Sequence, residues 1–164
     1  MANWCVGTLK IRGSFEQVCE LLINETCIPP HGLGKMAKEE VPPEKIVEKD
    51  ENSLSIELES NGWVIYQYDG FGLLGSIGMY IDPVDIEIRD DGIYCLELES
   101  KWEIDTNWIA KMCKKYQVDM KLFAFEKGQE FNRDIECLKG DLITDNVITY
   151  DNYFWECPYP ELGG

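Results

Sequence analysis

The sequence predicts an α+β domain in which strands and helices follow the order βαββαβ. Two stretches carry apolar residues at helical spacing, and several others alternate apolar and polar residues as half-buried strands do. Such an order closes most simply as a split unit, with a mostly antiparallel sheet and two helices on one face. Extra strands after residue 126 would extend or flank this sheet.

The first strand and helix are expected within residues 3–26. Residues 3–11 form an apolar-rich strand that Gly13 closes, and the Ser14–Gln17 stretch fits a capping box. The helix that follows has one apolar stripe, formed by Phe15, Val18, Cys19 and Leu22. Residues 27–52 are rich in proline, glycine and charge, and they predict a long loop.

The middle of the chain predicts short strands separated by turns. Residues 54–58 alternate apolar and polar side chains, and Asn61-Gly62 is a hairpin signal before a returning strand at 63–68. A second long loop is expected at 69–83, and a short strand at 86–89. An Asp-Gly turn then leads into a strand at 93–101.

The second helix and the last strands follow. Asp105 or Thr106 caps a helix whose apolar positions are Ile109, Met112, Cys113 and Tyr116. Residues 118–125 predict a strand, and residues 131–138 and 142–150 predict a hairpin. An aromatic stretch bounded by proline occupies 153–160. With 164 residues, the whole chain 1–164 is expected to be one acidic domain.

Charge is the strongest compositional signal. The chain has 31 acidic and 15 basic residues, a net charge of −16. Phosphate backbones and anionic lipids repel such a surface, so direct nucleic-acid or membrane binding is disfavoured and a basic partner is favoured. Residues 82–105 alone carry nine acids against two bases. Within that segment the predicted acidic face consists of Asp85, Glu87, Asp90, Asp91, Glu97, Glu99 and Glu103.

The chain has seven cysteines, an odd number, and no CxxC motif, which argues against a structural zinc site. Reduced thiols in a cytoplasmic protein are the expected state. No secretory signal or membrane-spanning apolar run is present in this sequence. Cys5 and Cys95 are expected to pack within strands. Cys157 is the better candidate for a reactive thiol because the C-terminal stretch that contains it is expected to be exposed.

Three motifs that could carry chemistry are weak. Residues 70–75 match GxGxxG, but Gly78 and Pro83 oppose the helix that a dinucleotide site needs. His31 lies four residues after Cys27, yet no third group that would orient it can be identified. The acids of residues 82–91 lack the ligand order of a calcium loop. We therefore predict no catalytic residue, metal or cofactor.

The opening MANWCVGTLKIRG and the segment LELESKWEIDTNWIAKMCKKYQVDMKLFAFEKGQEFN cover about a third of the chain and resemble the YubB-type ferredoxin-like family of plasmid, phage and pathogenicity-island proteins. The resemblance implies a ferredoxin-like fold and a mobile-element setting. No activity is assigned to that family, so it implies no catalytic residues. The family's Trp-Ser-Pro-Pro is replaced here by Trp102-Glu103-Ile104-Asp105.

Two functions of different class follow. The first is a non-enzymatic interaction protein whose acidic face binds a basic or nucleic-acid-handling host protein, presenting carboxylates where that partner expects phosphate, as a DNA mimic or anti-defence protein would. Trp102 and Trp155 are candidate pocket or interface aromatics. The alternative is a ligand-binding protein or enzyme that uses a cleft near the 27–52 and 69–83 loops, with Trp102, Cys27 and His31 as lining groups. The sequence does not predict an oligomeric state.

Overall fold

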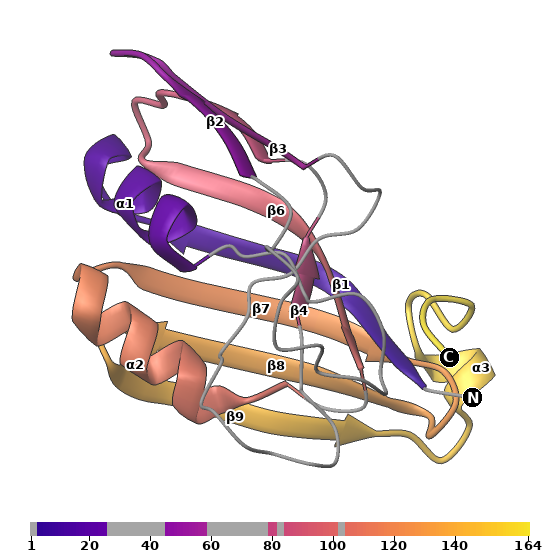
Figure 1. The fold of residues 1–164 in the computed structure, drawn as a ribbon. Coiled ribbons are helices and arrows are strands. Elements are labelled where there is room, and N and C mark those ends of the chain that lie inside the picture. The colour runs from indigo at the N-terminus through magenta and orange to yellow at the C-terminus, as the bar shows by residue number, and fades with distance from the viewer. Residues whose placement is uncertain (1–2, 26–44, 59–78, 82–83, 102–103) are drawn as a thin grey trace, which may run out of the picture.

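The computed structural model describes residues 3–25, 45–58, 79–81, 84–101 and 104–164. Within these residues the chain forms two antiparallel sheets and three helices, an α+β architecture (Figure 1). The elements in chain order are β1 (Trp4–Arg12), α1 (Phe15–Glu25), β2 (Lys45–Lys49), β3 (Ser53–Leu58), β4 (Met79–Ile81), β5 (Val84–Glu87), β6 (Ile93–Lys101), α2 (Thr106–Tyr116), β7 (Asp119–Glu126), β8 (Phe131–Leu138), β9 (Asp141–Thr149) and α3 (Tyr153–Glu156).

The larger sheet has six strands in the order β4-β6-β1-β7-β8-β9, and all neighbours are antiparallel. β1 lies in its interior and pairs with β6 over Trp4–Arg12 and with β7 over Val6–Arg12. β7, β8 and β9 follow one another as a meander, and the β8–β9 register shifts between Glu136 and Cys137. The predicted mostly antiparallel sheet is confirmed, but it is larger than expected.

The smaller sheet corrects two predictions. It has three strands in the order β2-β3-β5, so the strands predicted near 54–58 and 86–89 belong to this second sheet and not to the main one. β2 lies inside the expected 27–52 loop, and β4 lies inside the expected 69–83 loop. β2 was missed because Lys45, Glu48 and Lys49 read as loop residues, whereas charged side chains are common on exposed edge strands. The hairpin expected at 61–68 lies outside the described residues.

The two long helices begin as the sequence predicts. The backbone N–H of Gln17 donates to Ser14 Oγ at 3.3 Å, and the Ser14 N–H donates to Gln17 Oε1 at 2.9 Å, which is a capping box. The Asp105 carboxylate caps α2 by accepting from the N–H groups of Asn107 and Trp108 at 3.0 and 3.2 Å. α1 and α2 then lie side by side against one face of the large sheet (Figure 1).

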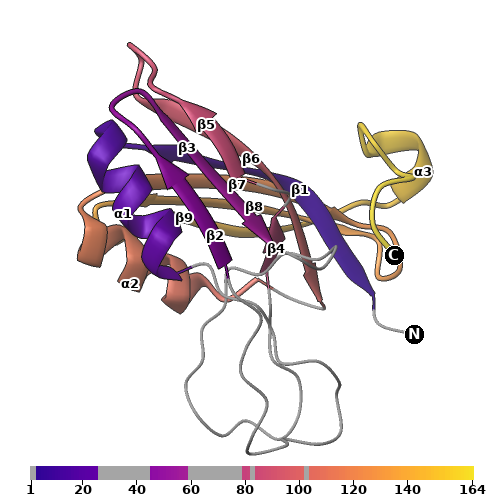
Figure 2. The ribbon, with the colours of Figure 1, turned by 45° about the horizontal axis from the view of Figure 1, so that its top comes forward.

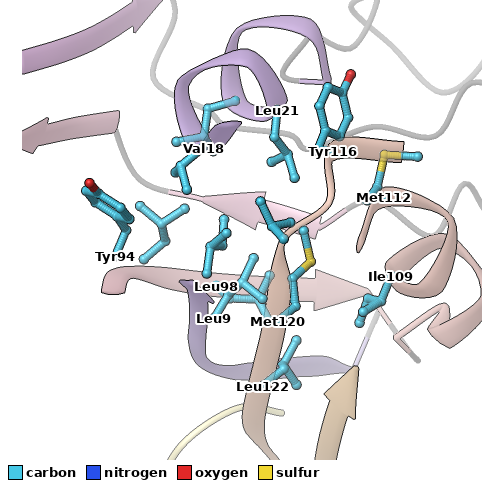
Figure 3. Close-up of a cluster of buried hydrophobic side chains, with 14 of the residues drawn as sticks. Leu9, Val18, Leu21, Tyr94, Leu98, Ile109, Met112, Tyr116, Met120 and Leu122 are labelled. Atoms are coloured by element: carbon cyan, nitrogen blue, oxygen red, sulfur yellow. The ribbon is translucent and has the colours of Figure 1, made fainter. Parts of the chain in front are cut away.

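One cluster of buried side chains joins the helices to both sheets. α1 contributes Val18 and Leu21, and α2 contributes Ile109 and Met112 (Figure 3). The large sheet supplies alternate residues of β1, β6 and β7, and the small sheet supplies Leu54, Ile56, Val84 and Ile86. Figure 2 shows the small sheet beside α1, over the β6 end of the large sheet. Both sheets therefore turn one side to a shared core.

Gly7 is the tightest point of the large sheet. It lies opposite Leu98 on β6 and Ala124 on β7. A Cβ atom there would lie 2.1 Å from the backbone oxygen of Phe123 and 2.6 Å from Ala124 Cα. Both distances are too short for non-bonded atoms, so the backbone would have to move. The close approach of β1 and β7 at this position requires glycine.

Replacing Gly7 by alanine is expected to lower the free energy of unfolding by about 3 kcal/mol, because the added methyl group overpacks a paired interior strand. Urea denaturation followed by circular dichroism measures the change. The neighbouring exposed residue supplies a control, since Thr8→Ala should cost less than about 1 kcal/mol. Equal losses for both variants would contradict a specific steric requirement at Gly7.

Candidate functional site

The predicted acidic residues that the structure describes are all exposed. Asp85 and Glu87 lie on β5, Glu97 and Glu99 lie on β6, and the remaining two, Asp90 and Asp91, lie in the turn between these strands. Glu103 and Trp102 are outside the described residues. For Glu97 and Glu99 the sequence predicted this exposure from strand alternation.

The structure separates these carboxylates into two groups. On β5, Val84 and Ile86 point into the shared core, so Asp85 and Glu87 point to the outer side of the small sheet. β6 buries Tyr94, Leu96 and Leu98 in the same core, so Glu97 and Glu99 point to the outer side of the large sheet. The turn that carries Asp90 and Asp91 joins the two groups.

Asp91 differs from the rest because it already has a partner. Arg89 Nη2 donates to Asp91 Oδ2 at 2.9 Å and Arg89 Nε donates to Oδ1 at 3.0 Å. These bonds and a third from the Ile93 N–H lower the pKa of Asp91 to about 2. Among the described residues, no ion pair engages Asp85, Glu87, Asp90, Glu97 or Glu99.

The cross-strand neighbours of Glu97 and Glu99 leave both carboxylates available. Glu97 lies opposite Thr8 and Glu99 lies opposite Val6 on β1. Neither of these two neighbours is basic. Lys10 of β1 points to the same side, opposite Cys95 and so diagonal to Glu97, and it is exposed with no ion pair among the described residues. The other bases of β1 and β7 on this side, Arg12 and Lys121, are paired with Asp119 and Glu136.

A second surface lies in residues 150–162, which we call the aromatic segment. Trp155 is 85% exposed, and Phe154 and Tyr159 are 53% and 61% exposed. The sequence singled out Trp155 as an interface candidate but did not predict α3, the four-residue helix that carries it. Aromatic side chains held in solvent are typical of binding surfaces.

Buried aromatic contacts anchor this segment to the outer side of the large sheet. Tyr153 and Cys157 are buried against Phe125 of β7, and Tyr159 stacks edge-on against the same ring at 5.5 Å. The Asn152 side chain caps α3 by accepting from the Trp155 N–H at 3.3 Å. The exposed rings therefore project from a segment that is packed down, not from a loose end.

Asn132 is the polar centre of this anchor. It is fully buried on β8, and its Nδ2 donates to the Tyr150 hydroxyl oxygen at 2.7 Å. Its Oδ1 accepts from the Tyr153 hydroxyl at 3.5 Å and from Cys157 Sγ at 3.6 Å. A buried side-chain amide that is satisfied in this way fixes the position of its partners.

The two residues that follow the segment are held against β1 and β7. The Gly164 N–H donates to the Trp4 carbonyl oxygen at 2.9 Å. Gly163 has a φ of +79°, and a Cβ there would lie within 2.5 Å of the carbonyl oxygens of Trp4 and Phe125. Glycine is required at this close approach.

The sequence analysis missed two buried charged residues next to this region, Arg133 and Glu126. Arg133 of β8 is 4% exposed and forms an ion pair with Asp145 of β9, while Glu126 is fully buried and accepts from the Gly128 N–H at 3.0 Å. The alternation along β8 could have revealed Arg133, since it shares its side of the strand with Ile135 and Cys137. Both charges act on the buried Cys5 thiol: after burial itself, Glu126 raises the pKa of this thiol and Arg133 lowers it.

Two cysteine predictions are wrong. Cys157 is buried beside Tyr153, because the tail folds onto the sheet, and Cys95 is exposed on β6, because it alternates outward with Glu97 and Glu99. Cys5 is buried as expected, and burial raises the pKa of its thiol to about 12. Cys27, His31 and the 70–75 motif lie outside the described residues.

Within the described residues no three metal-ligating side chains come together. No helix in the described part of the chain is long and apolar enough to cross a membrane. Comparison with known proteins gives no match to a family model, a curated protein or a solved structure. What the two surfaces do must therefore be argued from their own chemistry.

Replacing Asn132 by alanine is expected to release the aromatic segment. It leaves the Tyr150 and Tyr153 hydroxyls without their buried partner, at a cost of about 2 kcal/mol in the free energy of unfolding. Hydrogen exchange of residues 150–162 should become faster than that of β1. Asn146→Ala on the exposed edge strand β9 is the matched control, and equal exchange in both variants would contradict the anchor.

Alkaline pH is expected to loosen the same segment. Burial raises the pKa of Tyr153 and of Tyr150 above the ordinary value near 10. The folded state therefore holds these protons more tightly than the unfolded state, and stability is full below about pH 10 and falls as pH rises through the folded pKa values. Denaturation at pH 8 and pH 11 tests this, and Tyr153→Phe should show a smaller fall than the native protein.

Proposed function

We propose that the protein is an interaction protein whose exposed carboxylates bind a basic protein partner. The observation that carries the proposal is that five acidic side chains point to solvent with no ion pair in the described structure. Glu97 and Glu99 lie on the outer side of the large sheet, Asp85 and Glu87 on the outer side of the small sheet, and Asp90 in the turn between them. Carboxylates left unneutralised on strands present fixed negative charge at defined spacing. A basic surface is the chemistry that complements them.

The charge of the whole chain supports a protein partner over nucleic acid. A net charge of −16 repels phosphate and attracts cationic surfaces at long range. Proteins that handle nucleic acid carry such surfaces, because they neutralise phosphates with lysine and arginine. A host protein of this kind is the proposed partner, and the carboxylates would stand in for the phosphates that it binds.

We also propose that the fold is of the ferredoxin-like kind, in the mobile-element setting that the sequence resemblance implies. The support is the order β4-β6-β1-β7 in the large sheet, which is that of a split βαββαβ unit when α1 and α2 are its two helices. On this interpretation β2, β3 and β5 are additions around the short second strand. β8 and β9 extend the sheet beyond its usual edge.

The expected partner is found by affinity capture from a bacterial lysate and then measured with purified components by calorimetry. Glu97→Gln with Glu99→Gln should weaken binding about tenfold at 50 mM salt, and raising the salt to 300 mM should weaken binding of the native protein.

The control variant is Glu16→Gln with Glu20→Gln, which removes the same charge from the exposed side of α1. It should weaken binding less than the β6 variant does, since it is not on the proposed surface. Binding that does not respond to salt, or that falls equally in both variants, would overturn the proposal.

A further inference from the structure

Exposed large apolar side chains are concentrated in the aromatic segment. Of the nine such residues in the described structure, four lie between positions 154 and 162: Phe154, Trp155, Tyr159 and Leu162. Trp155 is the most exposed of the nine at 85%, although tryptophan has the largest apolar surface to bury. Core packing therefore does not account for its position.

The backbone that carries the exposed rings is anchored on both sides of Trp155. Tyr153 is 2% exposed and Cys157 is 5% exposed, and these two residues flank Trp155 along the chain. The Asn152 cap holds the first turn of α3, and the Asn132 amide holds Tyr150 and Tyr153. A rigid aromatic surface loses little conformational freedom on binding, which is the property of an interface anchor.

The charges around these rings are mostly negative. Asp151 and Glu156 are exposed on either side of Phe154 and Trp155, and no ion pair in the described structure engages them. Glu161 is paired with Lys127, the one base that the described structure places on this segment. An aromatic face next to free carboxylates attracts cations in two ways, through its ring quadrupole and through the neighbouring charge.

We propose that the aromatic segment binds arginine and lysine side chains of a basic protein segment, with the Trp155 indole as the central contact. This inference rests on the proposed function and adds a second contact surface for the basic partner, with the chemistry recognised there. Arginine fits best, because its planar guanidinium stacks on an indole while donating to a carboxylate such as Glu156.

The charge excludes two other occupants of this surface. A second copy of the chain would bring together two molecules of net charge −16, with the same carboxylates facing each other. An uncharged apolar partner would cover Trp155 but would leave Asp151 and Glu156 desolvated without partners. A cationic segment satisfies the rings and the carboxylates together.

The test uses the full chain and a fluorescein-labelled nona-arginine peptide, with affinity measured by anisotropy at 50 and 300 mM salt. Trp155→Ala should weaken binding about fivefold. This factor corresponds to the loss of one exposed cation–π contact worth about 1 kcal/mol. Trp155→Phe should recover part of that loss. Ile46→Ala removes an equally uncharged, exposed side chain from β2 and should leave affinity unchanged.

A second readout places the peptide on the ring itself. The readout is the NMR spectrum of nitrogen-15-labelled protein. The indole N–H signal of Trp155 is the one missing from the spectrum of Trp155→Phe, and it should shift when the peptide is added. Affinity that is unchanged in Trp155→Ala but reduced in Glu97→Gln/Glu99→Gln overturns the assignment to the aromatic segment and leaves the proposed function standing. Native protein that does not bind the peptide at 50 mM salt overturns both.

Discussion

The pairing of β1 with two neighbours over most of its length is the constraint on which the structure depends. Each residue of Val6–Arg12 has a partner on both β6 and β7, so β1 can neither shift register nor rotate without breaking both ladders. Leu9 and Ile11 then have to point to the helices, and Thr8 and Lys10 have to point away. Gly7 is the position where the pairing of β1 with β7 leaves no room for a side chain.

That one register decides which side of the large sheet carries charge. Since Leu9 lies opposite Leu96 and Leu122, the core side of three strands is fixed at once. The outer side of β6 is then Cys95, Glu97 and Glu99, and its carboxylates cannot turn inward without exposing Tyr94, Leu96 and Leu98. The acidic surface is therefore held in place by the burial of apolar side chains on the opposite side of the same strand.

Local patterns predicted the elements but not how they are shared between sheets. The capping box at Ser14, the helical stripes, the alternation of 93–101 and the strand at 131–138 depend on residues close in the chain, and the structure has them where the sequence placed them. Alternation predicts that Leu54 and Ile56 point to the same side of their strand. It does not predict which sheet the strand joins, because that depends on its pairing with β2 and β5. The second sheet could not be inferred, because β2 looked like a charged loop.

The same limit applies to the candidate site. Strand alternation was enough to predict that Glu97 and Glu99 are exposed, and the sequence also drew attention to Trp155. The anchor was not predictable, because it depends on Asn132, a residue of β8 that sequence spacing gives no reason to connect with Tyr150, Tyr153 or Cys157. An asparagine in a strand is ordinarily expected at the surface, and its burial here follows only from the way residues 150–164 return over the sheet.

This return of the chain explains why aromatic residues can remain exposed in a well-packed protein. Phe125, Tyr153 and Cys157 form the buried cluster between the segment and the sheet, and Trp155 lies outside that cluster. A folded chain tolerates one such ring, since most of its stability comes from the buried cluster beneath the helices. A net charge of −16 opposes self-association through the exposed ring, because copies of the chain repel one another. On the proposed function, negative charge and exposed tryptophan are complementary, because the charge selects which partners can reach the ring.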